Sequence, residues 1–312
     1  MLITGQGDFQ YEVIHDWAQP PDSLRFGNTH GVCEDAQGFI HLCHTVHASS
    51  PSPDAVAVFD PEGRFVRSWA GEFQGGAHGL QYVREGADEF LFLTDFLHAV
   101  VVKTTLAGEE VLRLGYPRDS ERYQDGRKFS PTNVAIAPNG DIYLADGYGS
   151  SFILHYDGKG NYLRTIGEAP GERDGELNCP HGLTIDTRGP EPLLLVADRT
   201  NRRLQYFTLE GAWVRTETGA VNLPCHFAER DGVLLIPDLA SRVTLLDRHN
   251  QPLAHLGEDD TGDYSQLRRQ PRENFRPGKF ICPHGACFDH DGNIFVAEWV
   301  ETGRVTKLRR LA

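Results

Sequence analysis

Three histidines, His78, His181 and His284, have the clearest chemical potential in this sequence, because each stands in the same short phrase and is followed by glycine. Each phrase begins an apolar segment, and a second apolar segment that ends in Asp or Glu follows it. Equivalent histidines of a repeat converge if the repeat closes into a ring. Three imidazoles with an open fourth position are a usual ligand set of catalytic zinc. The elements that carry the histidines therefore decide whether a metal site forms.

A second pattern, a turn followed by an apolar strand, recurs in register with the His-Gly phrases. Each repeat predicts four short strands joined by turns that contain Gly or Asn. In the third repeat, strands are predicted at residues 133–136, 141–145, 151–156 and 162–166. A period of about fifty residues with this strand content is typical of β-propeller blades.

The first strands of six such repeats can be located in the sequence. They begin near His30, His78, Thr132, His181, His226 and His284. The sixth repeat lacks its outermost strand. Residues 11–18 resemble residues 64–70, including a Trp-Ala ending, which predicts a closing strand at residues 10–18. We expect this N-terminal segment to complete blade six, because closure removes the exposed sheet edge that a linear array leaves.

The alternatives are an open solenoid or two β-sandwiches, and neither explains why one end of the chain supplies what the other end lacks. We therefore predict an all-β fold, a six-bladed β-propeller that forms one domain over residues 1–312. The charged stretch at residues 257–278 interrupts the pattern and predicts an insertion loop, either a binding loop or a lid.

The first strand of every propeller blade lines the central channel, so His78, His181 and His284 of blades two, four and six would surround one mouth. Alternate blades of a six-fold ring give the three-fold spacing that suits three imidazoles on one ion. The competing interpretation is that His-Gly is only a turn signature, with each histidine capping a strand.

Two residues that follow second strands, Tyr148 and Arg199, occur once each rather than in every repeat. A phenol near a cation can have its pKa lowered and act as a general base. A guanidinium can hold a carboxylate through two hydrogen bonds. The alternative is that Tyr148 packs in its Gly-rich turn and Arg199 pairs with a neighbouring Asp. The Asp residues at the same places, Asp146 and Asp198, are expected to hold the turns together.

Composition limits the classes of partner. The 312 residues carry a formal net charge of −14, and no stretch concentrates Lys and Arg. Nucleic acids and anionic membranes attract basic surfaces, so we expect neither as a partner and favour a small-molecule substrate. No targeting segment or membrane span is evident. The six cysteines form no CxxC pair, which predicts free thiols and a cytoplasmic location.

At these motifs the chain resembles the NHL-type propellers, and more closely the family of peptidyl-α-hydroxyglycine α-amidating lyases. The matching segments are residues 77–80, 131–136, 146–148, 180–183, 196–199 and 283–284. The resemblance implies a six-bladed propeller with zinc on His78, His181 and His284, and catalytic roles for Tyr148 and Arg199. The family splits a carbinolamide into an amide and glyoxylate.

The departures from the family pattern concern the periphery of the site. The Asp that follows the third histidine and helps to hold a calcium ion in the family is Gly285 here, so the resemblance leaves the calcium site open, with the Leu80 carbonyl as a remaining oxygen ligand. A substrate-binding Arg of the family has no counterpart in residues 42–47. The disulfide cysteines of the family fall on Gly149 and Tyr206, so those bridges are absent.

Together these features predict a metal-dependent lyase or hydrolase, with zinc as the expected ion, that acts on a small oxygenated substrate other than an amidating precursor peptide. Tyr148 would be the general base, and Arg199 would bind a carboxylate or oxyanion. Four further histidines would shape the substrate pocket: His30, His44, His47 and His226. The competing function is a non-enzymatic NHL-type propeller that binds a protein or ligand through exposed aromatic side chains.

Overall fold

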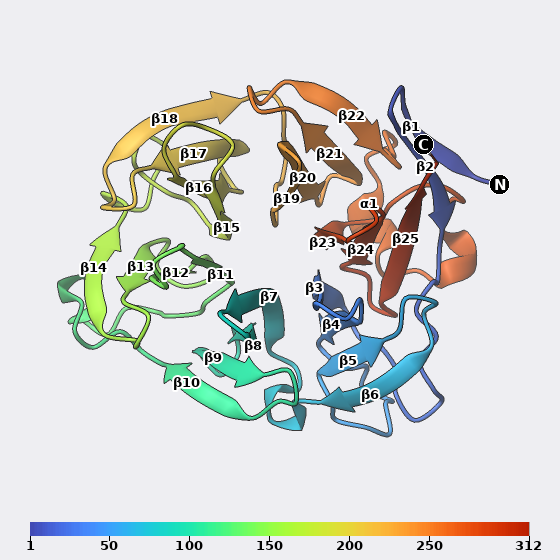
Figure 1. Cartoon of the computed structure of the whole chain (residues 1–312), viewed down its shortest axis with the longest axis horizontal. Helices are drawn as coiled ribbons and strands as arrows, with labels where there is room; N and C mark the ends of the chain where they lie inside the picture. Colours follow the sequence, from blue (N-terminus) through green and yellow to red (C-terminus); the bar gives the residue numbers. More distant parts are fainter. Residues whose placement is uncertain (312) are drawn as a thin grey trace. The chain divides into compact units, whose positions relative to one another are not determined.

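The computed structural model describes residues 1–311, and over these residues the strands form six antiparallel sheets. Five sheets have four strands and the sixth has five, and strands that follow one another in sequence are neighbours in every sheet. Such sheets are the blades of a β-propeller, so the predicted six-bladed fold is confirmed (Figure 1). The contacts divide the chain into two compact units, one of His78–Pro224 and one of Met1–Ala77 with the segment from Cys225 onward.

The unit of His78–Pro224, called unit B, contains blades two, three and four. Blade two has β7 (Ala77–Glu85), β8 (Asp88–Asp95), β9 (Val100–Thr105) and β10 (Glu110–Leu114). Blade three has β11 (Asn133–Ile136), β12 (Ile142–Ala145), β13 (Ile153–Tyr156) and β14 (Tyr162–Ile166). Blade four has β15 (Pro180–Asp186), β16 (Leu193–Asp198), β17 (Arg203–Phe207) and β18 (Trp213–Thr218). The boundaries predicted for blade three agree with these to within two residues.

The other unit, called unit A, contains blades one, five and six. Blade one has β3 (Thr29–Glu34), β4 (Ile40–His44), β5 (Val56–Phe59) and β6 (Phe65–Trp69). Blade five has β19 (Ala228–Arg230), β20 (Val233–Asp238), β21 (Arg242–Leu246) and β22 (Pro252–Leu256). Blade six has β23 (Pro283–Phe288), β24 (Ile294–Glu298) and β25 (Arg304–Arg310), to which β2 (Phe9–Ile14) and β1 (Ile3–Gln6) are added.

The N-terminal strand completes blade six, as predicted, because β2 pairs antiparallel with β25 in the register Tyr11↔Arg310. Two details of the prediction are wrong. The strand ends at Ile14 rather than at residue 18, since Asp16 has a φ of 54° and turns the chain. Trp17 then points into the core, where its ring lies 4.6 Å from that of Phe295. The strand β1 was not predicted, and it adds a fifth strand outside β2.

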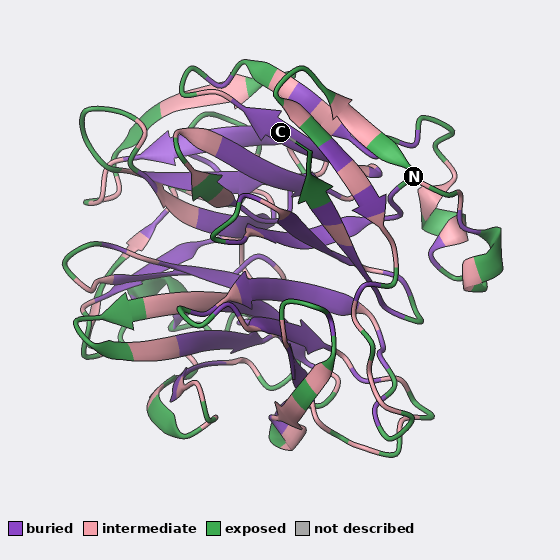
Figure 2. Cartoon of the chain, turned by 45° about the vertical axis from the view of Figure 1, so that its right-hand side comes forward, coloured by how far each residue is buried: buried purple, intermediate pink, exposed green. Residues whose placement is uncertain are grey.

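The hydrophobic core lies between neighbouring sheets, and the middle strands of the blades are mostly buried. In unit B, Leu194, Val196 and Phe207 of blade four pack with Tyr143 and Ile153 of blade three. Figure 2 shows the buried residues along the strands and the exposed residues in turns and outer strands. The outermost strands are more exposed, as the burial of β10, β14 and β18 shows.

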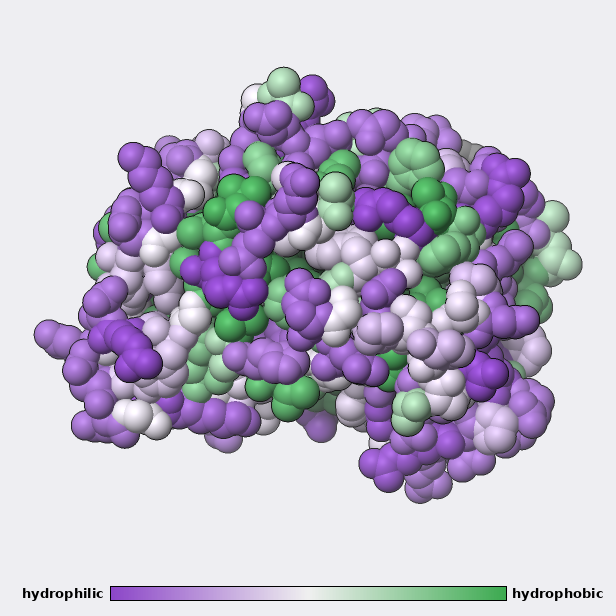
Figure 3. All heavy atoms as spheres, turned by 90° about the horizontal axis from the view of Figure 1, so that it is seen from below, coloured by the Kyte–Doolittle hydropathy of each residue, from purple (hydrophilic) through white to green (hydrophobic). Residues whose placement is uncertain are grey.

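The insertion at residues 257–278 is partly helical rather than a simple loop. It contains the short helix α1 (Tyr264–Leu267) and a 3₁₀ turn at Arg272–Asn274. Tyr264, Leu267 and Phe275 pack with a small apolar cluster beside the start of β23. The described helices are all short, and none has the length and apolar character needed to cross a bilayer. Figure 3 shows a face on which hydrophilic side chains predominate and hydrophobic ones lie in small groups.

Candidate functional site

Two of the predicted metal ligands and the predicted base come together in unit B. The Tyr148 hydroxyl lies 3.1 Å from Nε2 of His78 and 3.0 Å from Nε2 of His181. The two imidazole centroids are 4.8 Å apart. Both histidines stand at the second position of the innermost strand of their blade, and both are buried. The blade geometry that was predicted from the repeat therefore brings these three side chains to one place.

The orientation of His78 is fixed by the neighbouring blade. Its Nδ1 lies 2.8 Å from the carbonyl oxygen of Thr132, and a carbonyl only accepts hydrogen bonds. Nδ1 therefore carries the proton and donates it, which leaves the lone pair on Nε2. A backbone carbonyl that orients an imidazole in this way is the usual outer partner of a metal-ligating histidine.

Thr132 ties the starts of three blades together. Its carbonyl oxygen also accepts a hydrogen bond from the Thr94 hydroxyl, and that hydroxyl accepts one from the backbone N–H of Gly79. The Thr132 hydroxyl donates to the carbonyl of Pro180, at the start of blade four. A Cβ at Gly79 would lie 2.6 Å from the Thr132 carbonyl oxygen. The glycine after His78 thus permits close contact between blades.

The turn that presents Tyr148 is built around the buried carboxylate of Asp146. It accepts hydrogen bonds from the backbone N–H groups of Ser130 and Ser150 and from the hydroxyl of Tyr123. Burial raises the pKa of Asp146 to about 6, against the opposing effect of these hydrogen bonds. The expectation that this Asp holds its turn together is confirmed.

Arg199 reaches the same hydroxyl from blade four. Its Nη1 lies 3.5 Å from the Tyr148 oxygen, and its Cζ lies 5.3 Å from the centroid of the Tyr148 ring. Its Nη2 donates to Sγ of Cys179, at 3.2 Å. Burial raises the pKa of the Cys179 thiol, and the nearby guanidinium opposes that effect. Cys179 is a neighbour of the site that the sequence pattern did not single out.

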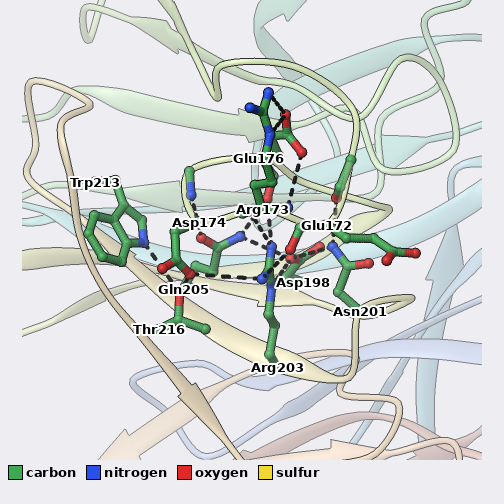
Figure 4. A network of polar contacts seen from close by, with 12 residues as sticks. Glu172, Arg173, Asp174, Glu176, Asp198, Asn201, Arg203, Gln205, Trp213 and Thr216 are labelled. Carbon is green, nitrogen blue, oxygen red and sulfur yellow. Dashed lines mark hydrogen bonds and ion pairs between the residues drawn. The ribbon is translucent and has the colours of Figure 1, made fainter.

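The carboxylate next to Arg199 in sequence, Asp198, is bound by other groups. Arg203 donates to it from Nε at 2.7 Å, and Asn201 and Gln205 add side-chain hydrogen bonds. Figure 4 shows this network, in which Arg203 also reaches the backbone of the segment that contains Glu172, Arg173 and Glu176. Asp198 therefore holds its turn, as expected, with Arg203 as its cationic partner.

In unit A, His30 and His284 stand at the second positions of β3 and β23 and face each other. Their ring centroids are 4.6 Å apart with perpendicular planes. A ligand atom of Cys225 also lies within 4.8 Å of one of His284. Gly285 is required here, because a Cβ would lie 2.0 Å from the carbonyl oxygen of His30. His226 is buried in the same unit, and burial lowers its pKa to about 4.

His44 and His47 make local contacts in blade one. The Nδ1 of His44 accepts hydrogen bonds from the backbone N–H groups of Gly27 and Val46, and burial lowers its pKa to about 4. The Nδ1 of His47 pairs with the side chain and backbone of Ser49. Their contribution to a substrate pocket stays a prediction.

The six cysteines are free and buried, as the sequence suggested. Burial raises the pKa of Cys43 and of Cys282 to about 12, so these two are small core residues in their thiol form. A cavity of about 710 Å³ in unit B is lined by the far ends of β7, β11 and β15, from residues 81–86, 135–140 and 183–187. It lies at the opposite ends of these strands from His78 and His181.

The residues of unit B fit a metal ion. The phenol of Tyr148 has one proton and faces two Nε2 atoms, so it can donate to only one of them. The Nε2 of His78 presents a lone pair that accepts the phenol proton. The contact with His181 is then satisfied by a neutral His181 that carries its proton on Nε2, or by a cation bound between the groups. That His284 of unit A is the third ligand stays a prediction.

Parts of the chain are similar in sequence to known amidating lyases. A probable peptidyl-alpha-hydroxyglycine alpha-amidating lyase of Caenorhabditis elegans is 43% identical over 79 residues, which cover 25% of this chain and 22% of that protein. Peptidyl-alpha-hydroxyglycine alpha-amidating lyase 1 of Drosophila melanogaster is 34% identical over 228 residues, 62% of this chain and 40% of its own length. The matches thus span less than half of either lyase.

A third relative matches along nearly the whole chain. NHL repeat-containing protein 3 of Homo sapiens is 26% identical over 303 residues, which cover 92% of this chain and 81% of that protein. No protein-family model matches the chain. The resemblance to both groups of propeller proteins, inferred from the motifs, is confirmed by these relatives.

Solved structures share the fold. A streptogramin B lyase superposes with a TM-score of 0.63 at 14% identity, over 96% of this chain and 97% of that one. A gluconolactonase from Xanthomonas campestris gives a TM-score of 0.66 at 14% identity, over 99% of this chain and 95% of that one. At this level of identity the likeness concerns the propeller architecture alone.

Proposed function

We propose that this protein is a metal-dependent lyase or hydrolase that acts on a small oxygenated substrate. The observation that carries the proposal is the contact of one phenol, that of Tyr148, with Nε2 atoms of two histidines from different blades and with a guanidinium. Relatives named as amidating lyases support it. A structural turn tyrosine has no need of two imidazoles and a cation around its hydroxyl.

In this proposal His78, His181 and His284 hold the ion, and zinc is the expected one. A zinc ion bound in this way supplies a Lewis acid that polarises a hydroxyl or carbonyl oxygen, or acidifies a water molecule. A metal ion binds an imidazole through a nitrogen that carries no proton, and the Thr132 carbonyl sets the tautomer of His78 that leaves the proton off Nε2.

Tyr148 serves as the general base that removes a proton from a substrate hydroxyl. Arg199 favours the phenolate, because its guanidinium donates toward the phenol oxygen. The guanidinium also supplies further N–H donors for a carboxylate or oxyanion of the substrate. His30 and His226 line the pocket, and His44 and His47 support the same region in blade one.

The substrate is a hydroxy acid, keto acid or sugar derivative rather than an amidating precursor peptide. The family's further substrate-binding Arg has no counterpart in residues 42–47, where the chain has two histidines. A histidine-rich pocket suits hydroxyl and keto oxygens. Cleavage of an α-hydroxyglycine to glyoxylate is the first reaction to assay.

A second candidate function is a non-enzymatic NHL-type propeller that binds a protein or ligand. The relative that covers most of the chain, NHL repeat-containing protein 3, favours it. This candidate requires neither a bound transition metal nor turnover.

Elemental analysis of the purified protein under non-stripping conditions separates the two functions. The proposal expects close to one equivalent of transition metal in the wild type and loss of that metal in His181→Ala. A matched control is His155→Ala, which removes another buried histidine of unit B that bonds Asp141 rather than Tyr148. Metal below about 0.2 equivalents in the wild type overturns the proposal.

Tyr148→Phe tests the assignment of the base. The phenyl ring keeps the edge-on contacts with His78 and Phe96, so the fold and the metal content should stay unchanged. Loss of a general base lowers turnover about 10²- to 10⁴-fold. Loss of metal in this variant would contradict the role of Tyr148 as a general base that does not bind the metal.

A further inference from the structure

The insertion at residues 257–278 places an arginine at the start of the inner strands of unit A. Arg268 follows α1, and its backbone carbonyl accepts a hydrogen bond from the backbone N–H of Glu301. Figure 1 shows α1 beside β23 and β24. The anchoring is apolar as well, because Tyr264 and Leu267 pack with Ile281 and Val300.

The guanidinium of Arg268 is held along one edge. Its Nε donates to the carbonyl oxygen of Trp299 at 3.1 Å, and its Nη2 donates to Oδ1 of Asn28 at 2.7 Å. Its Cζ lies 3.4 Å from the centroid of the Trp299 ring, so the plane is supported by the indole. These contacts fix the side chain. The remaining nitrogen, Nη1, makes no hydrogen bond to the described residues, and it is not one of the fully buried polar atoms without a partner.

Arg268 is a buried cation without a counter-ion. Only 8% of the residue is exposed. Among the described residues no carboxylate lies within ion-pair distance of it, whereas the next residue, Arg269, pairs with Glu301 at 3.9 Å. Desolvation lowers the pKa of Arg268. Buried charges in proteins are generally paired, so an unpaired guanidinium at a fixed position marks a place for an anion.

The position of Arg268 relates it to the candidate site. Asn28 lies two residues before His30, at the start of β3. Trp299 follows β24, and its backbone N–H donates to the carbonyl of Cys282, two residues before His284. Arg268 thus stands at the same ends of blades one and six as the two histidines that face each other.

We infer that Arg268 is a substrate-specificity residue that binds a carboxylate through the open edge of its guanidinium. This rests on the proposed function and deepens it, because it commits the substrate to carry a carboxylate. A planar carboxylate matches the fork of N–H donors on a guanidinium. The insertion thus supplies an arginine, whereas residues 42–47, where the lyase family has a substrate-binding arginine, contain none.

The test is a titration of the purified, metal-loaded protein with acetate and with acetamide, followed by calorimetry and by tryptophan fluorescence. Acetate should bind at least about ten times more tightly than acetamide, and Arg268→Gln should abolish that preference. Arg268→Lys keeps the charge but loses the fork, so it should retain a weaker preference. The control Arg269→Gln removes the neighbouring, exposed cation and should leave it unchanged.

Thermal unfolding accompanies each titration, because Arg268 also anchors the insertion. If Arg268→Gln unfolds too early to be titrated, Arg268→Lys and the fluorescence of Trp299 on addition of acetate provide the comparison. Equal binding of acetate by wild type and a folded Arg268→Gln or Arg268→Lys variant overturns the inference, since acetate would then bind elsewhere, for example at the metal.

The outcomes separate this inference from the proposed function. Selective loss of acetate binding in Arg268→Gln, in a protein that contains no metal and shows no turnover, supports the arginine site and refutes the enzyme. Metal-dependent turnover with a carboxylate preference that Arg268→Gln leaves intact supports the enzyme and refutes the arginine site.

Discussion

The pH dependence of stability should differ between the wild type and Asp146→Asn. A carboxylate with a lowered pKa makes the folded state more stable as the pH rises, whereas Asp146, whose pKa is raised, should make it less stable. Asp146 is completely buried below the turn that carries Tyr148, and burial raises its pKa from 3.8 to about 6. Between these pH values the folded chain holds a proton that the unfolded chain has released. The free energy of unfolding of the wild type therefore falls as the pH rises through this window.

The size of the effect follows from the two pKa values. At about 1.36 kcal/mol per pH unit, the difference between 3.8 and about 6 corresponds to about 3 kcal/mol. The Asp146→Asn variant has no charge to bury, so its unfolding free energy lacks this loss. A second effect does not depend on pH: the new amide group would face the backbone N–H of Ser150, and an unsatisfied buried donor costs about 1–3 kcal/mol.

The assay is urea unfolding of wild type and Asp146→Asn at pH 4, 5, 6 and 7. The stability of the wild type relative to the variant should decline by about 2 kcal/mol from pH 4 to pH 7, since part of the effect falls below pH 4 and the change is nearly complete by pH 7. Asp157→Asn is the control, because hydrogen bonds to Asn161 hold the pKa of Asp157 below its ordinary value. The stability of the wild type relative to this control variant should change little from pH 4 to pH 7, because the effect of a lowered pKa falls below about pH 3.8. A wild-type advantage over Asp146→Asn that stays constant or grows with pH would refute the reasoning.

Three further changes test the packing of unit A. Gly285→Ala places a Cβ 2.0 Å from a carbonyl oxygen of blade one and should cost more than about 1 kcal/mol in urea unfolding, whereas Gly115→Ala, with open space around it, should be nearly neutral. Removal of residues 1–6 should lower the melting temperature slightly, but removal of residues 1–14 should abolish cooperative unfolding because blade six loses its outer strand. Burial lowers the pKa of His44 to about 4, so the wild type should lose stability as the pH falls from 6.5 to 4, and this loss should be smaller in His44→Gln; an equal loss in both would contradict it.

The fold was predictable because each blade has the same short sequence patterns, which depend on residues close together in the chain. Turns with Gly or Asn and apolar strands recur, and the strands of blade three were placed to within two residues. The course of residues 15–18 was not predictable from the likeness of Trp17 to Trp69. Trp17 packs on Phe59 and Phe295, which lie far away in sequence, and such tertiary packing overrides a local strand pattern.

For the site, the repeat was sufficient to bring His78, Tyr148 and His181 together, because equivalent blade positions lie at the same end of neighbouring sheets. The partner of Asp198 was not predictable in the same way. Arg199 and Arg203 are both close in sequence, and only the strand geometry decides that Arg203 reaches the carboxylate while Arg199 turns toward Tyr148. Arg199 lies in the turn between β16 and β17, whereas Arg203 is the first residue of β17.

Threonine hydroxyls give the blade starts a rigidity that a ligand site requires. In unit B, the Thr132 hydroxyl donates to the Pro180 carbonyl, and its own carbonyl receives His78. In unit A, the Thr29 hydroxyl donates to the Glu298 carbonyl in the same manner. Rotation of the His78 ring breaks its hydrogen bond to the backbone of the next blade. The imidazole of His78 is therefore oriented by a contact that also joins neighbouring blades, so a substitution at Thr132 should lower stability and, under the proposed function, metal affinity together.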